Sequence, residues 1–404
     1  MEEVHPDKPS IAVLPFVNLT GDPHKDYFSD GLTINFITQL YKIPNLFVIA
    51  HQSSFKYKGK ALKIQQLGRE LGVRYVLEGG VQISGHRIRI NAQLIDTQTG
   101  DHIWAERYDR ELKDVFALQD EIIRKAVTEM AVKVSWGEDI RWVTSATEDF
   151  EALDYYFKSY ELFVRFEKES NAQARRFLEK AIELDPKYAL AIAFLGYTHL
   201  MDARLKWVKS PRLSVEQAEE LAHRAVAIDD CLVLAHQLLG SVYMHKGLYD
   251  KALAAKERAI VCEPNNAVAI NSLANALNYA GRQMEALKYS RKAMRLYPHP
   301  PYHLLFTAGR TNYFAEQYEA AITEWLKIIE RFPGSRAQEN WPWLIASYME
   351  LGREKEARSE VQKLLEQRPD MSIEAHVKKL KNQPFKDFLF LDHHVELLRK
   401  AGLK

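Results

Sequence analysis

The fold is decided by LGSVYMHKGLYDKALAAKERAIVCEP (residues 239–264), which returns with the same spacing as LANALNYAGRQMEALKYSRKAMRLYP (residues 273–298). In both stretches a small pair near the start is followed by two alanines and a closing proline. The closing prolines recur at Pro264, Pro298, Pro333 and Pro369, with gaps of 34, 35 and 36 residues. This period predicts helix pairs that cannot bury their apolar faces alone and therefore stack on their neighbours.

The period and the small residues resemble the tetratricopeptide (TPR) repeat. About six units are counted over residues 137–371, and the first two are irregular, as expected where a stack meets another domain. Extra residues around Met201 to Leu213 separate the helices of the second unit. The resemblance implies an all-α solenoid whose concave surface binds a protein or peptide. Residues 372–404 are expected to form a C-terminal helical cap.

The chain ahead of the repeats alternates strands and helices. Ser10–Phe16 and Asn45–Ala50 are short apolar runs typical of buried strands, and helices are expected over Asp26–Tyr41 and Lys63–Leu71, the latter closed by Gly72. Strands Arg74–Ile83, His86–Asp96 and His102–Tyr108 then follow with short turns, and Val115–Val134 is a long helix. From His86 to Asp96, apolar Ile88, Ile90, Ala92 and Leu94 alternate with polar residues, which predicts one buried and one wet face. Residues 10–136 are therefore expected to form an α+β domain with a mixed sheet, after a linker at residues 1–9.

The strings PSIAVLPFVNLTGD, YFSDGLT, GRELGVRYVLEGGV and RIRINAQLIDTQTGDHIWAERYD in this region resemble the TolB-like amino-terminal module of bacterial multidomain proteins. That module commonly precedes TPR repeats and often follows a class III adenylate cyclase domain, or sometimes a winged-helix DNA-binding domain. The phrase Pro6–Ser10 resembles the linker after the cyclase, and the ending PFKDFLFLDHHVELLRKAGLK resembles the close of the same proteins. The resemblance carries no catalytic residue into this chain.

Composition narrows the function classes. The net charge of +1 argues against a nucleic-acid-binding surface. The sequence contains no run of about 18 apolar residues, so no membrane span is expected. The start has no apolar core of a signal peptide. Cys231 and Cys262 are expected to be free thiols in a reducing cytoplasm. Nothing in the sequence excludes a homodimer.

Motifs for catalysis, cofactors or metals are weak. Asp22, Asp26 and Asp30 could bind a cation, but a turn and helix start capped by Asp is the favoured interpretation. The adjacent His393 and His394 face different ways on a helix, so no metal site is expected there. A basic hairpin face with Arg87, Arg89 and Arg107 is diluted by acidic neighbours. We expect no catalytic residue, no metal and no cofactor, and hence no enzyme in this chain.

The candidate partner-binding residues come from the TPR resemblance, which places three first-helix positions of each unit on the concave side. In the fourth unit these are Asn271, Asn275 and Asn278, and asparagine is a poor helix former. Arg310 at a matching place could make a charge-assisted contact. Weaker candidates are Gln237, Ser241, Tyr197 and Tyr313. The alternative is a wet helix face or contacts to the chain's own tail.

Three functions are open from the sequence. The first is a non-catalytic interaction module, the accessory region of a bacterial adenylate cyclase-like signalling protein. The second is the regulatory region of a winged-helix transcription regulator whose DNA-binding domain lies elsewhere. The third is an unrecognised small-molecule-binding domain, for which no motif speaks.

Overall fold

The computed structural model describes residues 9–43, 46–60, 63–130, 147, 149–332, 334 and 339–404. Several expectations fall outside these residues. They are most of the linker at residues 1–9, the start of the second predicted strand at Asn45, the end of the long helix, the domain boundary at residue 136, and Pro333.

The amino-terminal part is a mixed sheet, as the sequence predicts. Its order is β3-β1-β4-β5-β6, with β2 also paired to β4. The strands are β1 (Ser10–Val13), β2 (Val17–Asn18), β3 (Phe47–Val48), β4 (Tyr75–Ser84), β5 (Arg87–Asp96) and β6 (His102–Glu111). The pairs β1–β3, β1–β4 and β2–β4 are parallel, whereas β4–β5 and β5–β6 are antiparallel. The short parallel strands are joined through helices and the long antiparallel ones through tight turns, which is what each pairing requires.

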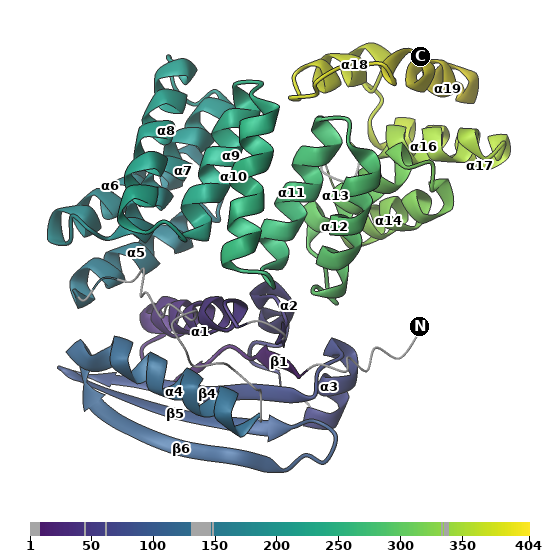
Figure 1. The fold of residues 1–404 in the computed structure, drawn as a ribbon. Coiled ribbons are helices and arrows are strands. Elements are labelled where there is room, and N and C mark those ends of the chain that lie inside the picture. The colour runs from purple at the N-terminus through teal and green to yellow at the C-terminus, as the bar shows by residue number, and fades with distance from the viewer. Residues whose placement is uncertain are drawn as a thin grey trace. The chain divides into compact units, whose positions relative to one another are not determined.

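Helices cover both faces of this sheet. The apolar face of β5, with Ile88, Ile90 and Leu94 fully buried, packs in one core with α1 (Asp26–Tyr41) and α4 (Val115–Glu129). Figure 1 shows these two helices lying along the sheet. On the other face, α3 (Ile64–Leu71) closes a smaller core. Gly72 ends α3 with a φ of 66°, the left-handed cap predicted from the sequence.

Short elements between β1 and β4 were not expected from the sequence. They are β2, the 3-10 turn η1 (Pro23–Lys25) and the five-residue helix α2 (His51–Phe55). A second 3-10 turn, η2 (Leu112–Asp114), leads into α4.

Helices fill the rest of the chain and follow one another in antiparallel pairs (Figure 1). They are α5 (Phe150–Phe163), α6 (Lys168–Leu184), α7 (Ala189–Leu205), α8 (Pro211–Ile228), α9 (Val233–His245), α10 (Tyr249–Cys262), α11 (Ala267–Tyr279), α12 (Gln283–Arg295), α13 (Tyr302–Phe314), α14 (Tyr318–Arg331), α16 (Trp341–Glu350), α17 (Glu354–Gln367), α18 (Ile373–Lys381) and α19 (Leu391–Ala401). The expectation of extra loop residues at Met201–Leu213 is wrong at both ends, because α7 continues to Leu205 and α8 begins at Pro211.

The small residues of the repeats lie where helices meet, as predicted. The repeat alanines Ala252, Ala259, Ala286, Ala293, Ala321 and Ala357 are all fully buried. A Cβ on Gly309 would come within 2.8 Å of the ring of Trp325, so this helix contact leaves no room for a side chain. The first pair is irregular because α5 serves two cores. Its Leu153 and Phe157 pack into the core of the sheet domain.

Two compact units describe the chain. Unit 1 is Met1–Val242, Ala254–Ala269 and Leu296–Pro298, and unit 2 is Tyr243–Leu253, Ile270–Arg295 and His299–Lys404. The boundary between the two units falls within the repeats. The domain limits expected from the sequence lie instead where the sheet ends and the helices begin, and they stay a prediction.

Candidate functional site

Arg310 is the centre of the polar cluster in unit 2. It lies on α13 with none of its surface exposed. Its Nη2 donates to Oδ1 of Asn275 on α11, and its Nη1 donates to Oε1 of Gln383 at 3.1 Å. The structure therefore brings together Asn275 and Arg310, both candidates from the sequence, and adds Gln383 from the C-terminal tail.

Aromatic rings enclose the guanidinium group of Arg310. Its central carbon lies 4.2 Å from the ring centroid of Tyr279, 4.9 Å from that of Phe306 and 5.5 Å from that of Phe385. Nε of Arg310 is buried without a hydrogen-bond partner, and within the described part of the chain no carboxylate pairs with this arginine. A buried charge is costly unless it is paired, so here the ring faces and amide oxygens carry the whole compensation.

A non-helical segment of the tail covers this cluster. We call residues 382–390, which join α18 to α19, the strap. The hydroxyl of Tyr279 donates to Oε1 of Gln383 at 3.4 Å, and the backbone N–H of Lys386 donates to the carbonyl oxygen of Tyr279 at 2.9 Å. The ring of Phe385 lies 4.9 Å from that of Tyr279, edge to face. The strap thus lies on α11 and α13 with side-chain and backbone contacts.

The other predicted residues of unit 2 also face the interior of the chain. Asn278 is 2% exposed and its Nδ2 donates to Oγ1 of Thr311 at 2.7 Å. The Tyr313 hydroxyl is 3.0 Å from Nδ1 of His394 on α19, and Asn271 is 6% exposed. For Arg310 and Tyr313 the structure has the contacts to the tail that the sequence left as the alternative. Binding of a partner by these residues stays a prediction.

The strap has one feature in its sequence that indicates burial. Its stretch PFKDFLF carries three phenylalanines within six residues, and such density in a polar tail indicates burial. Phe385 and Phe390 indeed join the core of unit 2, and Phe390 lies 4.9 Å from the ring of Phe314.

A second polar cluster lies in unit 1, on the repeat helices α7, α9 and α10. Nζ of Lys256 is 3.5 Å from both Oε1 of Gln237 and Oγ of Ser241. Burial, together with the charge of Arg204, lowers the pKa of Lys256 to about 7. Burial also raises the pKa of Tyr197, the third residue predicted here, to about 12. A lysine that the sequence did not single out thus contacts the predicted Gln237 and Ser241, and Tyr197 is hydrogen-bonded to Ser241.

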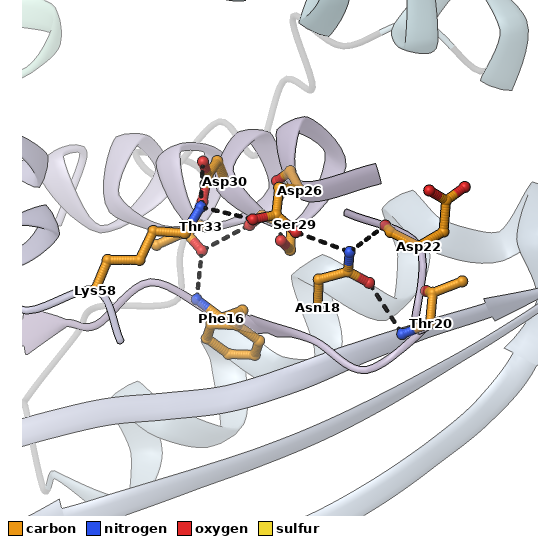
Figure 2. A network of polar contacts seen from close by, with 9 residues as sticks. All are labelled: Phe16, Asn18, Thr20, Asp22, Asp26, Ser29, Asp30, Thr33 and Lys58. Atoms are coloured by element: carbon orange, nitrogen blue, oxygen red, sulfur yellow. Dashed lines mark hydrogen bonds and ion pairs between the residues drawn. The ribbon is translucent and has the colours of Figure 1, made fainter. Parts of the chain in front are cut away.

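The aspartates of the amino-terminal domain form a structural network (Figure 2). Oδ1 of Asp22 caps η1 by accepting from the N–H of His24, and Asn18 Nδ2 donates to Oδ1 of Asp26 at 2.9 Å. Nζ of Lys58 lies 2.8 Å from Asp30 and 3.4 Å from Asp26.

A hydrogen bond and burial shift the pKa values of two of these aspartates in opposite directions. The bond from Asn18 lowers the pKa of Asp26, whereas burial raises that of Asp30. The favoured interpretation of a capped turn therefore accounts for Asp22, and a lysine neutralises the other two carboxylates.

The remaining candidates form surface pairs. In the hairpin, Arg87 and Arg89 both pair with Asp109, while Arg107 is exposed. His393 Nε2 lies 2.9 Å from Glu350, and His394 faces the opposite way into the core. Among the described residues no group of three or more His, Cys, Asp and Glu side chains is placed to hold a metal ion.

The expectation of two free thiols is wrong. Cys231 and Cys262 form a disulfide with a Cα–Cα distance of 5.4 Å. The reason is the antiparallel helix pair, since Cys231 lies just before α9 and Cys262 ends α10, so both reach the same end of the pair. The support that free thiols lent to a cytoplasmic location is lost, and that location stays a prediction. No described helix is long and apolar enough to cross a membrane.

Two family models match parts of the chain. Residues 257–288 match the tetratricopeptide repeat, so the chain contains TPR repeats. Residues 7–125 match the model described as the HilA/YgeH-like transcriptional regulator, second domain. This match does not show the TolB-like module that the sequence strings suggested, and that resemblance stays a prediction.

One curated relative is a putative adenylate cyclase 3 of Rhizobium meliloti (strain 1021), 47% identical over 234 residues. The aligned region covers 58% of this chain but only 40% of that protein. The chain thus spans well under half of the relative's length.

Solved TPR structures are similar at low identity. YrrB, described as a TPR protein with an unusual peptide-binding site, is 21% identical with a TM-score of 0.39, covering 50% of this chain and 97% of its own. The Pseudomonas aeruginosa pilF structure is 17% identical with a TM-score of 0.44, covering 57% and 96%.

Proposed function

We propose that this chain is a non-catalytic interaction region of a bacterial adenylate cyclase-like signalling protein, and that its TPR repeats bind a protein or peptide. The observation that carries the proposal is the series of stacked helix pairs with buried alanines at their contacts, because such solenoids present extended surfaces for partners. The relative named a putative adenylate cyclase supports the signalling context. We propose a cytoplasmic location, in which the Cys231–Cys262 disulfide has to persist against a reducing environment.

In such a protein a separate domain would carry the catalytic residues. The aligned region corresponds to 40% of the relative's length, so the larger part of that protein lies outside the alignment. We therefore assign this chain the role of setting the output of a neighbouring domain according to the partner bound.

A second candidate function is the regulatory region of a transcription regulator. It is favoured by one observation, the match of residues 7–125 to the second domain of HilA/YgeH-like regulators. The reading frame around this sequence separates the two candidates. A cyclase domain fused to it supports the first, and a winged-helix domain supports the second.

Site-specific cross-linking in living cells tests the binding role itself. A photo-reactive amino acid replaces Ser241, which lies in the unit 1 cluster, and in a matched control it replaces Glu257, an exposed residue of α10. We expect a discrete cross-linked protein with the Ser241 probe that is absent with the Glu257 probe. Identical patterns from both positions, or none from either, would count against a binding role for these repeats.

A further inference from the structure

The strap lies on α11 and α13 as a bound peptide would. It has no regular secondary structure between Lys381 and Leu391, and two of its side chains anchor it. Gln383 accepts hydrogen bonds from Arg310 and Tyr279, and Phe385, 8% exposed, lies against the rings of Tyr279 and Phe314. Pro384 between them is the centre of a tight turn, in which the N–H of Phe385 donates to the carbonyl oxygen of Gln383 at 2.9 Å.

The chemistry of this surface does not match the strap completely. Arg310 is a permanent cation with no exposed surface, yet its partners are the neutral amides of Asn275 and Gln383, and its Nε–H has none. A carboxylate oxygen in the place of Oε1 of Gln383 would accept from the same two donors and would also neutralise the charge. The bond from Arg310 to Gln383 already has an ionised donor, so what a carboxylate adds is the attraction between two opposite charges, which is stronger in a buried site than in water.

The middle of the strap is exposed to solvent. Lys386 and Asp387 are exposed, and Leu389 has 88% of its surface exposed. Release of the strap can therefore begin from this side while α18 and α19, which carry their own apolar contacts in unit 2, remain packed.

We propose that the surface of α11 and α13 around Arg310 is a peptide-binding site for partners that present an acidic residue two positions before an aromatic residue. In the free chain, Gln383 and Phe385 hold this place with a neutral mimic of that motif. The inference rests on the proposed binding function and names the chemistry of its partner. Because the strap is tethered, its effective concentration is in the millimolar range, so a partner must exceed its affinity to displace it.

Two labelled peptides and the full chain test the proposal. One peptide has the sequence of residues 381–391, KNQPFKDFLFL, and the other has glutamate in the position of Gln383. The receptor is the double variant Gln383→Ala/Phe385→Ala, which weakens the strap but keeps both flanking helices. We expect the glutamate peptide to bind this variant at least about tenfold more tightly than the glutamine peptide, because only its side chain carries a charge opposite to that of Arg310. Adding Arg310→Met should remove the preference.

Matched controls and a second measurement keep the test decisive. Lys386→Ala/Asp387→Ala alters exposed positions of the same strap and should leave peptide binding as weak as in the unchanged chain. If the Gln383→Ala/Phe385→Ala variant fails to fold, Gln383→Glu in the otherwise unchanged chain should slow amide hydrogen exchange across residues 382–390 at least about tenfold, because the strap then carries the preferred acid. Equal affinity of the two peptides, or exchange that is unchanged or faster in Gln383→Glu, would overturn the inference.

The two proposals fail separately. A peptide preference without any Ser241 cross-link removes the binding role of the unit 1 repeats and leaves this site standing. A Ser241 cross-link without a peptide preference removes only the acidic-aromatic motif.

Discussion

Breaking the Cys231–Cys262 disulfide should destabilise the helix pair α9–α10. The bond closes a loop with a sequence separation of 31 residues. In the chain-entropy description, a loop of this length restricts the unfolded state by about 12 cal/mol/K, which is about 3.7 kcal/mol at room temperature. For a unit of this size, each kcal/mol corresponds to roughly 2 °C in the unfolding midpoint, so we expect Tm to fall by about 7 °C.

The assay compares thermal unfolding of the unchanged chain with and without a non-thiol reductant, and of Cys231→Ser/Cys262→Ser. Both the reduced chain and the double variant should show the loss, and adding reductant to the variant should change nothing further. Alkylation followed by mass spectrometry counts the thiols. Two alkylated cysteines in the native oxidised protein, or a Tm that is indifferent to reductant, would refute the reasoning.

Three further outcomes are expected from the structure. Gly79→Ala places a Cβ 2.0 Å from the carbonyl oxygen of Asn91, so it should break the β4–β5 pairing. Circular dichroism should show the loss of the sheet signal in this variant. The control Ser84→Ala should keep that signal. Trp325→Ala empties a fully buried site and should cost about 3–5 kcal/mol in urea unfolding. Acidification should weaken unit 2, because burial lowers the pKa of His376 to about 4 and that of His394 well below 6.5. The unfolded chain takes up these protons first, so stability is full above pH 6.5 and falls from there towards pH 4, with a smaller fall in His376→Gln.

Local patterns predicted the longer elements of the sheet domain and the helix contacts, but not the short elements β2, η1 and α2. The helix Asp26–Tyr41 is observed with those bounds, and the alternation from Ile88 to Leu94 settles the buried face of β5. Such features depend on residues a few positions apart, which a single sequence displays. The positions of the repeat alanines could be predicted equally well, because the same short pattern returns in each unit. Any larger side chain at these positions would separate the helices.

Contacts between distant residues were not predictable in this way. The bond from Arg310 to Gln383 joins residues 73 positions apart, and the hydrogen bond between Tyr313 and His394 joins residues 81 apart. Neither has a pattern that periodicity can reveal, because each joins side chains on elements that are far apart in the chain. The disulfide is an intermediate case. Its two cysteines flank one predicted helix pair, and antiparallel geometry would have brought them together, but cysteine number alone suggested free thiols.

The asparagines of α11 gain a physical explanation from the same contacts. Asparagine weakens a helix, and the sequence suggested that an external ligand offsets this cost. In the structure Asn278 bonds to Thr311 and Asn275 to Arg310, both across to α13. Hydrogen bonds within unit 2 therefore offset the cost before any ligand arrives, and they hold the guanidinium group in a fixed position. What the fold leaves unmet is the charge of Arg310. A partner at this surface is then selected by its acid more than by its amide contacts, and its apparent affinity is reduced by the fraction of molecules in which the strap is in place.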